Sequence, residues 1–207
     1  NNLIKRTIKE HKRIIFNGNG YDDAWIKEAE KRGLSNYRTT PDALPQYINE
    51  KNIKLFTDHK VFTEAEMHSR YEIHLENYCK VSGIEANTMV SMVKKYIFPS
   101  VTAYIKDLSN TLNELKSAAP KACSKAEEEL IVKLSNLLNT LYDDNNKLEE
   151  YSIKATEIAD LKVRADHYRD AVIPAMAKVR ASADELELIT AKKYWPMPTY
   201  GDLIYKV

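Results

Sequence analysis

The chain has 207 residues, of which 43% are hydrophobic and 29% are charged, and it contains only five glycines. Its 31 Lys and Arg residues nearly balance 30 Asp and Glu residues and are interleaved with them, which argues against a surface for nucleic acid or an anionic membrane. The hydrophobic content excludes a disordered chain, and the scarcity of glycine favours an all-α protein over a sandwich or barrel.

The sequence carries no sign of export or membrane insertion. No stretch approaches the ~18 consecutive apolar residues of a membrane span, and the start, NNLIKRTIKEHKR, lacks the apolar region of a signal peptide. The absence of an initiator Met predicts a piece of a longer protein. Cys79 and Cys123 have no CxxC spacing, so we expect buried or half-buried free thiols and a cytoplasmic location.

The first part of the chain, residues 1–61, predicts a series of short helices with at most one short strand at residues 13–16. The segment LIKRTIKEHK places Leu3, Ile4 and Ile8 on one helical face. The boundary signals of the next helices are an N-cap at Asp22, a stop at Gly33, an opening at Thr40-Pro41 and a further short helix at residues 52–59.

Long helices are predicted from residue 62 onward. Thr63 and Glu66 have the spacing of a capping box, and Phe62 precedes them as a hydrophobic staple. We expect a helix from there to Val81, an interruption at Gly83, and a longer helix over residues 84–119, closed by Pro120. Within the longer helix, apolar residues recur at a 4-3-4-3 spacing, namely Val101, Ile105, Leu108, Leu112 and Leu115.

Two further long segments complete the predicted bundle. A leucine-rich helix begins near Ser124, and the polar cluster DDNN at residues 143–146 is expected to break it or solvate its end. The last segment has apolar residues at every seventh position: Tyr151, Ile158, Ala165, Val172, Val179 and Leu186. Such patterns specify long helices packed at shallow angles, so we predict two helical hairpins forming an antiparallel bundle over residues 62–193.

Prolines mark two bends and the end of the bundle. Pro99 and Pro174 fall inside long helices, and we expect each to bend its helix, most simply as a static bend. The tail WPMPTYGDLIYKV contains two prolines that predict an extended segment over residues 194–207. Its aromatic side chains are candidates for docking into a groove of this chain or a neighbouring one: Tyr194, Trp195, Tyr200 and Tyr205.

The segment IIFNGNGY is the most suggestive candidate for a phosphate site, because an apolar run and a glycine-rich turn precede a helix. It matches neither GxxxxGK[ST] nor GxGxxG, and Asp22 and Asp23 beside it would repel a phosphate. We therefore predict a tight turn in which Asn and Gly adopt left-handed conformations. Nucleotide binding through this turn is the alternative.

No other group of residues in the sequence indicates a catalytic or metal-binding site. His68 and His74 are six residues apart and face different sides of a helix, so they do not form an i,i+4 metal pair. Glu72 and Glu76 have that spacing, but Arg70 and Lys80 are close enough to form ordinary helix ion pairs with them. We predict no catalytic, cofactor-binding or metal-ligating residue in this chain.

Several segments together carry a resemblance to one family. In chain order they are IIFNGNGYDDAWIKEAEKRGL, FTEAEMHSRYEIHLENYCK, IEANTMVSMVKKYIFPSV, YRDAVIPAM and YWPMPTYGDLIY. Their order resembles that at the C-terminal end of type III glutamine synthetases, the long bacterial and protist form of the enzyme. The resemblance extends from about His11 to Tyr205 and matches none of the enzyme's active-site motifs.

The resemblance implies a parent enzyme that joins ammonia to glutamate with ATP and divalent metal ions (Mg²⁺ or Mn²⁺), bound by domains N-terminal to this segment. It implies two partners, the chain's own catalytic domain and neighbouring subunits of a ring, and a structural role for these residues. By themselves they are expected to be inactive. The alternative is a free-standing helical-bundle module that binds other proteins.

Overall fold

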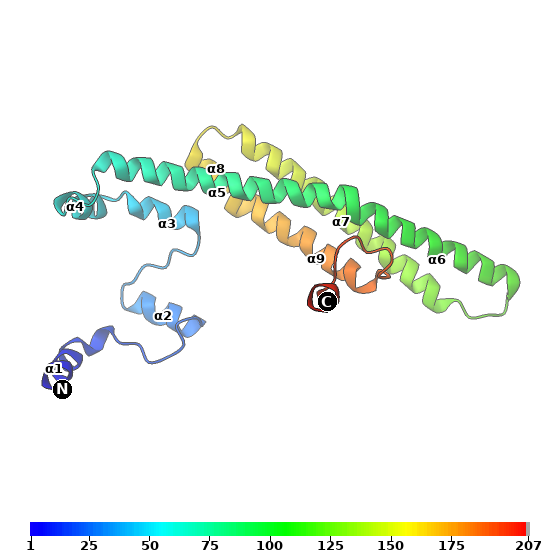
Figure 1. The fold of residues 1–207 in the computed structure, drawn as a ribbon, viewed down its shortest axis with the longest axis horizontal. Helices are drawn as coiled ribbons and strands as arrows, with labels where there is room; N and C mark the ends of the chain where they lie inside the picture. The colour runs from blue at the N-terminus through cyan, green and yellow to red at the C-terminus, as the bar shows by residue number, and fades with distance from the viewer. Residues whose placement is uncertain (206–207) are drawn as a thin grey trace.

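The computed structural model describes residues 1–205 and consists of helices joined by short loops (Figure 1). Among the elements named below, η1 is a 3-10 turn, whereas η2 and η3 are π-helical turns. In chain order the elements are α1 (Asn2–His11), η1 (Lys12–Ile14), α2 (Asp23–Lys31), α3 (Thr40–Tyr47), α4 (Glu50–Asp58), α5 (Glu64–Met92), η2 (Val93–Ile97), α6 (Phe98–Ala118), α7 (Lys125–Glu157), α8 (Leu161–His167), η3 (Tyr168–Val172), α9 (Ile173–Ile189) and α10 (Tyr200–Ile204).

The all-α class and the antiparallel long-helix bundle are confirmed. The expected strand is wrong: residues 12–14 form the turn η1, and residues 1–205 contain no strand. No helix in that range is long and apolar enough to cross a membrane.

Three long helical rods form the bundle, not two hairpins (Figure 1). The first rod is α5, η2 and α6. It begins with the predicted capping box, in which the Thr63 hydroxyl accepts the Glu66 N–H at 3.3 Å and the Glu66 carboxylate accepts the Thr63 N–H at 2.7 Å. The expected interruption at Gly83 is wrong, because Gly83 is buried inside α5. A Cβ atom there would lie 2.7 Å from the Tyr168 hydroxyl of η3, so glycine permits a close approach between two rods.

The second rod is α7, which runs through the DDNN cluster without a break. Asn145 is 2% exposed and lies between Leu141 and Leu148, which are fully buried at the same helical spacing. The prediction that DDNN ends the helix is therefore wrong, because core packing on α7 overrides the local polar sequence. The third rod is α8, η3 and α9, which returns along α7.

The core lies along the faces that α7 presents to its neighbours. α7 contacts α5, α6 and α9, and α5 also contacts α8. Four of the heptad positions predicted for the last rod are at most 1% exposed: Ala165, Val172, Val179 and Leu186. These buried positions explain why the third rod packs against α7 along its length.

The two prolines of the long rods, Pro99 and Pro174, each follow a π-helical turn. Phe98 precedes Pro99 and donates its N–H to the Val93 carbonyl, and Ile173 precedes Pro174 and donates to the Tyr168 carbonyl. These i→i−5 bonds replace the ordinary helical pattern where proline lacks an N–H and crowds the preceding turn. Each helix thus continues beyond its proline.

The short helices divide into two groups. α3 contacts α5 and α8, and the Arg169 guanidinium joins them through ion pairs to Asp42 at 2.5 Å and Asp166 at 2.9 Å. Residues 1–38, which we call the arm, stand apart from the rods (Figure 1). Only one arm residue, Ala29, is buried. The arm therefore has almost no core of its own.

Candidate docking site

The chain returns onto the bundle after α9 through residues 190–205, which we call the strap. The prediction of an extended tail is only partly correct. A turn at residues 192–194 and an irregular segment lead into the short helix α10. Thr199 and Asp202 form a second capping box that begins α10, and the Lys192 ammonium group pairs with Asp202. The turn and the helix are thereby linked.

Tyr194 fixes the beginning of the strap on the first rod. Its ring lies 5.1 Å from the ring of Tyr104 in α6, and its hydroxyl donates a hydrogen bond to Asp107. The Lys193 ammonium nitrogen is 3.6 Å from the same carboxylate. The Tyr194 hydrogen bond, followed by the nearby charge of Lys193, lowers the pKa of Asp107 below its ordinary value.

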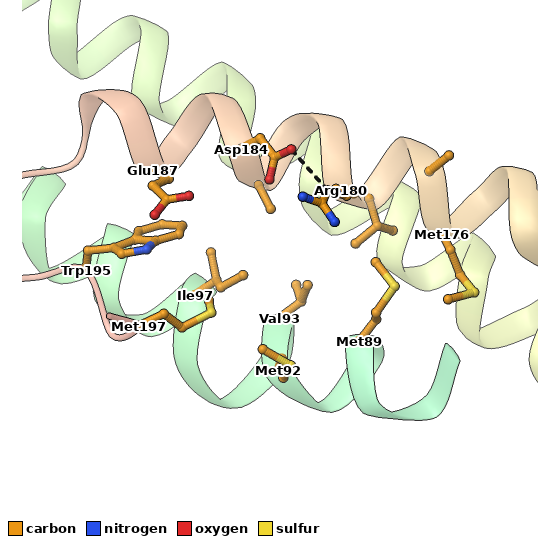
Figure 2. A pocket seen from close by; sticks show the side chains of 13 residues that line it. Met89, Met92, Val93, Ile97, Met176, Arg180, Asp184, Glu187, Trp195 and Met197 are labelled. Atoms are coloured by element: carbon orange, nitrogen blue, oxygen red, sulfur yellow. Dashed lines mark hydrogen bonds and ion pairs between the residues drawn. The ribbon is translucent and has the colours of Figure 1, made fainter. Parts of the chain in front are cut away.

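Trp195 and Met197 continue the strap over an apolar groove between the first rod and α9 (Figure 2). The groove encloses about 410 Å³. Four of the five methionines of the chain line it: Met89, Met92, Met176 and Met197. The buried Trp195 indole nitrogen has no hydrogen-bond partner within residues 1–205. The groove therefore has flexible apolar walls, which suit an apolar group of variable shape.

The polar rim of the groove comes from α9. Arg180 pairs with Asp184 at 3.2 Å, and Glu187 lies next to the Trp195 ring in Figure 2. Within residues 1–205, Glu187 forms no ion pair. The nearby Lys192 and Lys193 pair instead with Asp202 and Asp107. One carboxylate at the mouth of the groove is therefore available to a cation.

The aromatic residues chosen from the sequence are placed differently from one another. Tyr194 and Trp195 are half-buried against this chain's own bundle, whereas Tyr205 is 81% exposed. The side chain of Tyr200 lies outside the part of the chain that the structure describes. Sequence reasoning missed the methionine groove, and the only signal for it was the Met89–Met92 pair one helical turn apart.

The NGNG segment is a folded loop packed on α2. The rings of Phe16 and Trp25 are 4.6 Å apart, and the Arg32 guanidinium lies about 6 Å from both. The predicted N-cap is confirmed, since Asp22 accepts the Trp25 N–H at 3.3 Å and so occupies the helix end that a phosphate would need.

Backbone conformations in this loop differ from the prediction. The predicted left-handed turn at NGNG is wrong, because within residues 1–205 a positive φ occurs only at Lys60 and Gly33. Gly33 is the predicted stop of α2, where the Leu34 N–H donates to the Ala29 carbonyl.

The remaining candidates for chemistry stay apart. In residues 1–205 no three His, Cys, Asp or Glu side chains come together as metal ligands. The ion pairs expected for Glu72 and Glu76 are absent from that range, and Arg70 lies over the Phe62 ring at 4.4 Å instead. Cys79 is a buried free thiol, but Cys123 is exposed, which corrects its predicted burial.

Known proteins resemble this chain over nearly its whole length. The profile of the glutamine synthetase C-terminal domain family matches residues 1–116. A glutamine synthetase of Butyrivibrio fibrisolvens is 38% identical over 99% of this chain and 29% of its own length. A type-3 glutamine synthetase of Dictyostelium discoideum is 32% identical over 99% of this chain and 28% of its own. The chain thus spans less than a third of the length of these relatives.

Proposed function

Because the chain belongs to the glutamine synthetase C-terminal domain family, we propose that it is the non-catalytic helical end of a type III enzyme that makes glutamine from glutamate, ammonia and ATP. The observation that carries the proposal is the likeness to two glutamine synthetases, one named as type-3, over 99% of this chain. ATP and Mg²⁺ or Mn²⁺ would bind to the rest of the enzyme.

Within this proposal the three parts of the chain have different roles. Residues 1–61 join the bundle to the catalytic part, residues 62–193 brace that part and contribute contacts between subunits of a ring, and residues 194–207 form a docking segment. The uninterrupted rods and the buried heptad positions support a rigid brace. The enzyme would act in the cytoplasm.

The test compares the full-length enzyme with a version from which these 207 residues are removed. We expect the full-length enzyme to form glutamine and to sediment as a ring, and the shortened enzyme to lose ring assembly and most activity. The 207-residue chain alone is expected to be inactive. A full-length enzyme that forms no glutamine would contradict the proposed reaction, and unchanged assembly of the shortened enzyme would contradict the structural role.

The docking role of residues 194–207, which include most of the strap, needs a separate test in which these residues are deleted from the full-length enzyme. Trp195 and Met197 pack against the core, so this deletion should loosen the bundle as well as any contact beyond it. We expect a smaller fraction of the enzyme to sediment as a ring, and we expect lower glutamine-forming activity. Unchanged assembly together with unchanged activity would reject the strap as a docking segment.

A further inference from the structure

We propose that α1 of one subunit packs into the methionine-lined groove of a neighbouring subunit. The inference rests on the proposed oligomeric role and specifies two surfaces that would meet. It begins from two features that the fold leaves unmatched: an apolar groove on the bundle and an apolar helix face on the arm.

The helix face is that of α1, which has no buried residue. Leu3, Ile4 and Ile8 lie on one side of α1 and are 66%, 61% and 51% exposed. A ten-residue helix of this kind is marginal in water without packing partners, so its apolar face requires a surface to cover it. No described part of this chain provides that cover.

The groove is suited to such a helix. Its walls are the methionines and aliphatic side chains of two parallel-lying rods, which can adapt to branched side chains such as those of isoleucine. Amphipathic helices bind in grooves of this type through anchors spaced three or four residues apart, and Ile4 and Ile8 have that spacing. Shape and spacing thus agree.

Charge identifies α1 as the occupant. Residues 2–13 contain five Lys or Arg residues and one Glu, whereas the charged residues that line the groove are Asp184, Glu187 and Arg180, and Arg180 is paired with Asp184. Lys5, Lys9 and Lys12 make no ion pair within residues 1–205, and Glu187 at the groove mouth is also free there. A lysine of α1 can therefore approach the Glu187 carboxylate.

A second exposed apolar segment, α10, fits the groove less well. Leu203 and Ile204 of α10 are 67% and 65% exposed. However, α10 is only five residues long, and its one charged residue, Asp202, is acidic like the groove. Within α10 there is no cation for Glu187.

The direct test is cross-linking between two differently tagged copies of the full-length enzyme. Both copies carry Cys123→Ser, which removes the exposed thiol; one also carries Ile8→Cys and the other Ala183→Cys. With a short bismaleimide, we expect covalent dimers that carry both tags. A cross-link obtained only when both cysteines are in one copy, or none at all, would overturn the proposal.

A second measurement asks whether the contact supports assembly. We expect Ile8→Asp in the full-length enzyme to weaken subunit association about tenfold, as loss of a buried interface anchor does. The matched control is Ile153→Asp on α7, where the side chain is 57% exposed and lies outside the groove. If Ile8→Asp has no more effect than this control while removal of all 207 residues abolishes the ring, the docking inference fails and the proposed function stands.

Discussion

The arm and the bundle share an amphipathic sequence pattern but differ in how much of their apolar surface is buried. In both regions apolar residues recur at helical spacing, and helices form in both. In the bundle such residues form a buried core across three rods, whereas in the arm only Ala29 is buried. Periodicity therefore determines that a helix has an apolar face, but not whether the same chain provides the surface that covers it. We propose that the bundle folds by itself and that the arm needs a partner.

The largest expected difference between the two regions comes from truncating one leucine in each. Leu141 is 0% exposed at the centre of α7, so Leu141→Ala should lower the free energy of unfolding by about 2–5 kcal/mol. Leu3 is 66% exposed in the arm, so Leu3→Ala should change it by less than about 0.5 kcal/mol. Urea unfolding of the 207-residue chain measures both. Equal losses would mean that the arm is packed against the bundle in solution.

A pair of glycine substitutions gives the next largest contrast. Gly→Ala ordinarily stabilises a helix by about 0.5–1 kcal/mol. In Gly83→Ala, however, the new Cβ would lie 2.7 Å from the hydroxyl of buried Tyr168. We therefore expect the free energy of unfolding to fall by about 1–3 kcal/mol. Adding Tyr168→Phe removes that oxygen and leaves the ring carbon at 3.5 Å, which should restore most of the loss.

The control for this pair is Gly20→Ala in the arm, where the added Cβ meets nothing within 4 Å. We expect its unfolding transition to coincide with that of the parent chain. If Gly83→Ala behaved the same way, the close approach of α5 and η3 would be looser than the structure shows.

The smallest expected effect is on the strap, whose attachment depends on pH. The pKa of Asp107 is lowered in the folded chain by the Tyr194 hydrogen bond, so the stability from this contact is complete above the unfolded pKa of about 3.9. That stability is lost as the pH falls through the lowered folded value. Asp107→Asn should therefore reduce the Tm at pH 7 and have less effect at pH 2.5.

Asp143→Asn serves as the control for this experiment, because Asp143 is exposed and its side chain makes no hydrogen bond or ion pair within residues 1–205. Its Tm should follow that of the parent chain at both pH values. An Asp107→Asn effect that grew on acidification would contradict the assigned direction of the pKa shift.

Local signals predicted the beginnings of several helices correctly, because caps act within a few residues. Thr63 with Glu66 and Asp22 are examples, and Gly33 marks the end of α2 in the same way. The breaks expected at Gly83 and at the DDNN cluster were wrong, because their neighbours in space compensate for poor helix propensity. Only the assembled bundle shows that Gly83 faces Tyr168 and that Asn145 lies in the core.

The candidate site was predictable only in part, for the same reason. Aromatic residues among prolines indicated a segment that docks, and Tyr194 and Trp195 do lie against the bundle. The groove beside them was not predictable, since Met89 and Met176 lie far apart in the sequence and each matches an ordinary core position. The π turns before Pro99 and Pro174 also had no sequence signal beyond proline itself.

We propose that the bundle is complete by itself while the arm needs a partner. Hydrogen–deuterium exchange tests it most directly when the 207-residue chain is compared with the full-length enzyme. We expect slow exchange of the buried faces of α5, α7 and α9 in both proteins, and fast exchange of α1 in the chain alone that becomes slow in the full-length enzyme. Slow exchange of α1 in the chain alone, or fast exchange in both proteins, would contradict it.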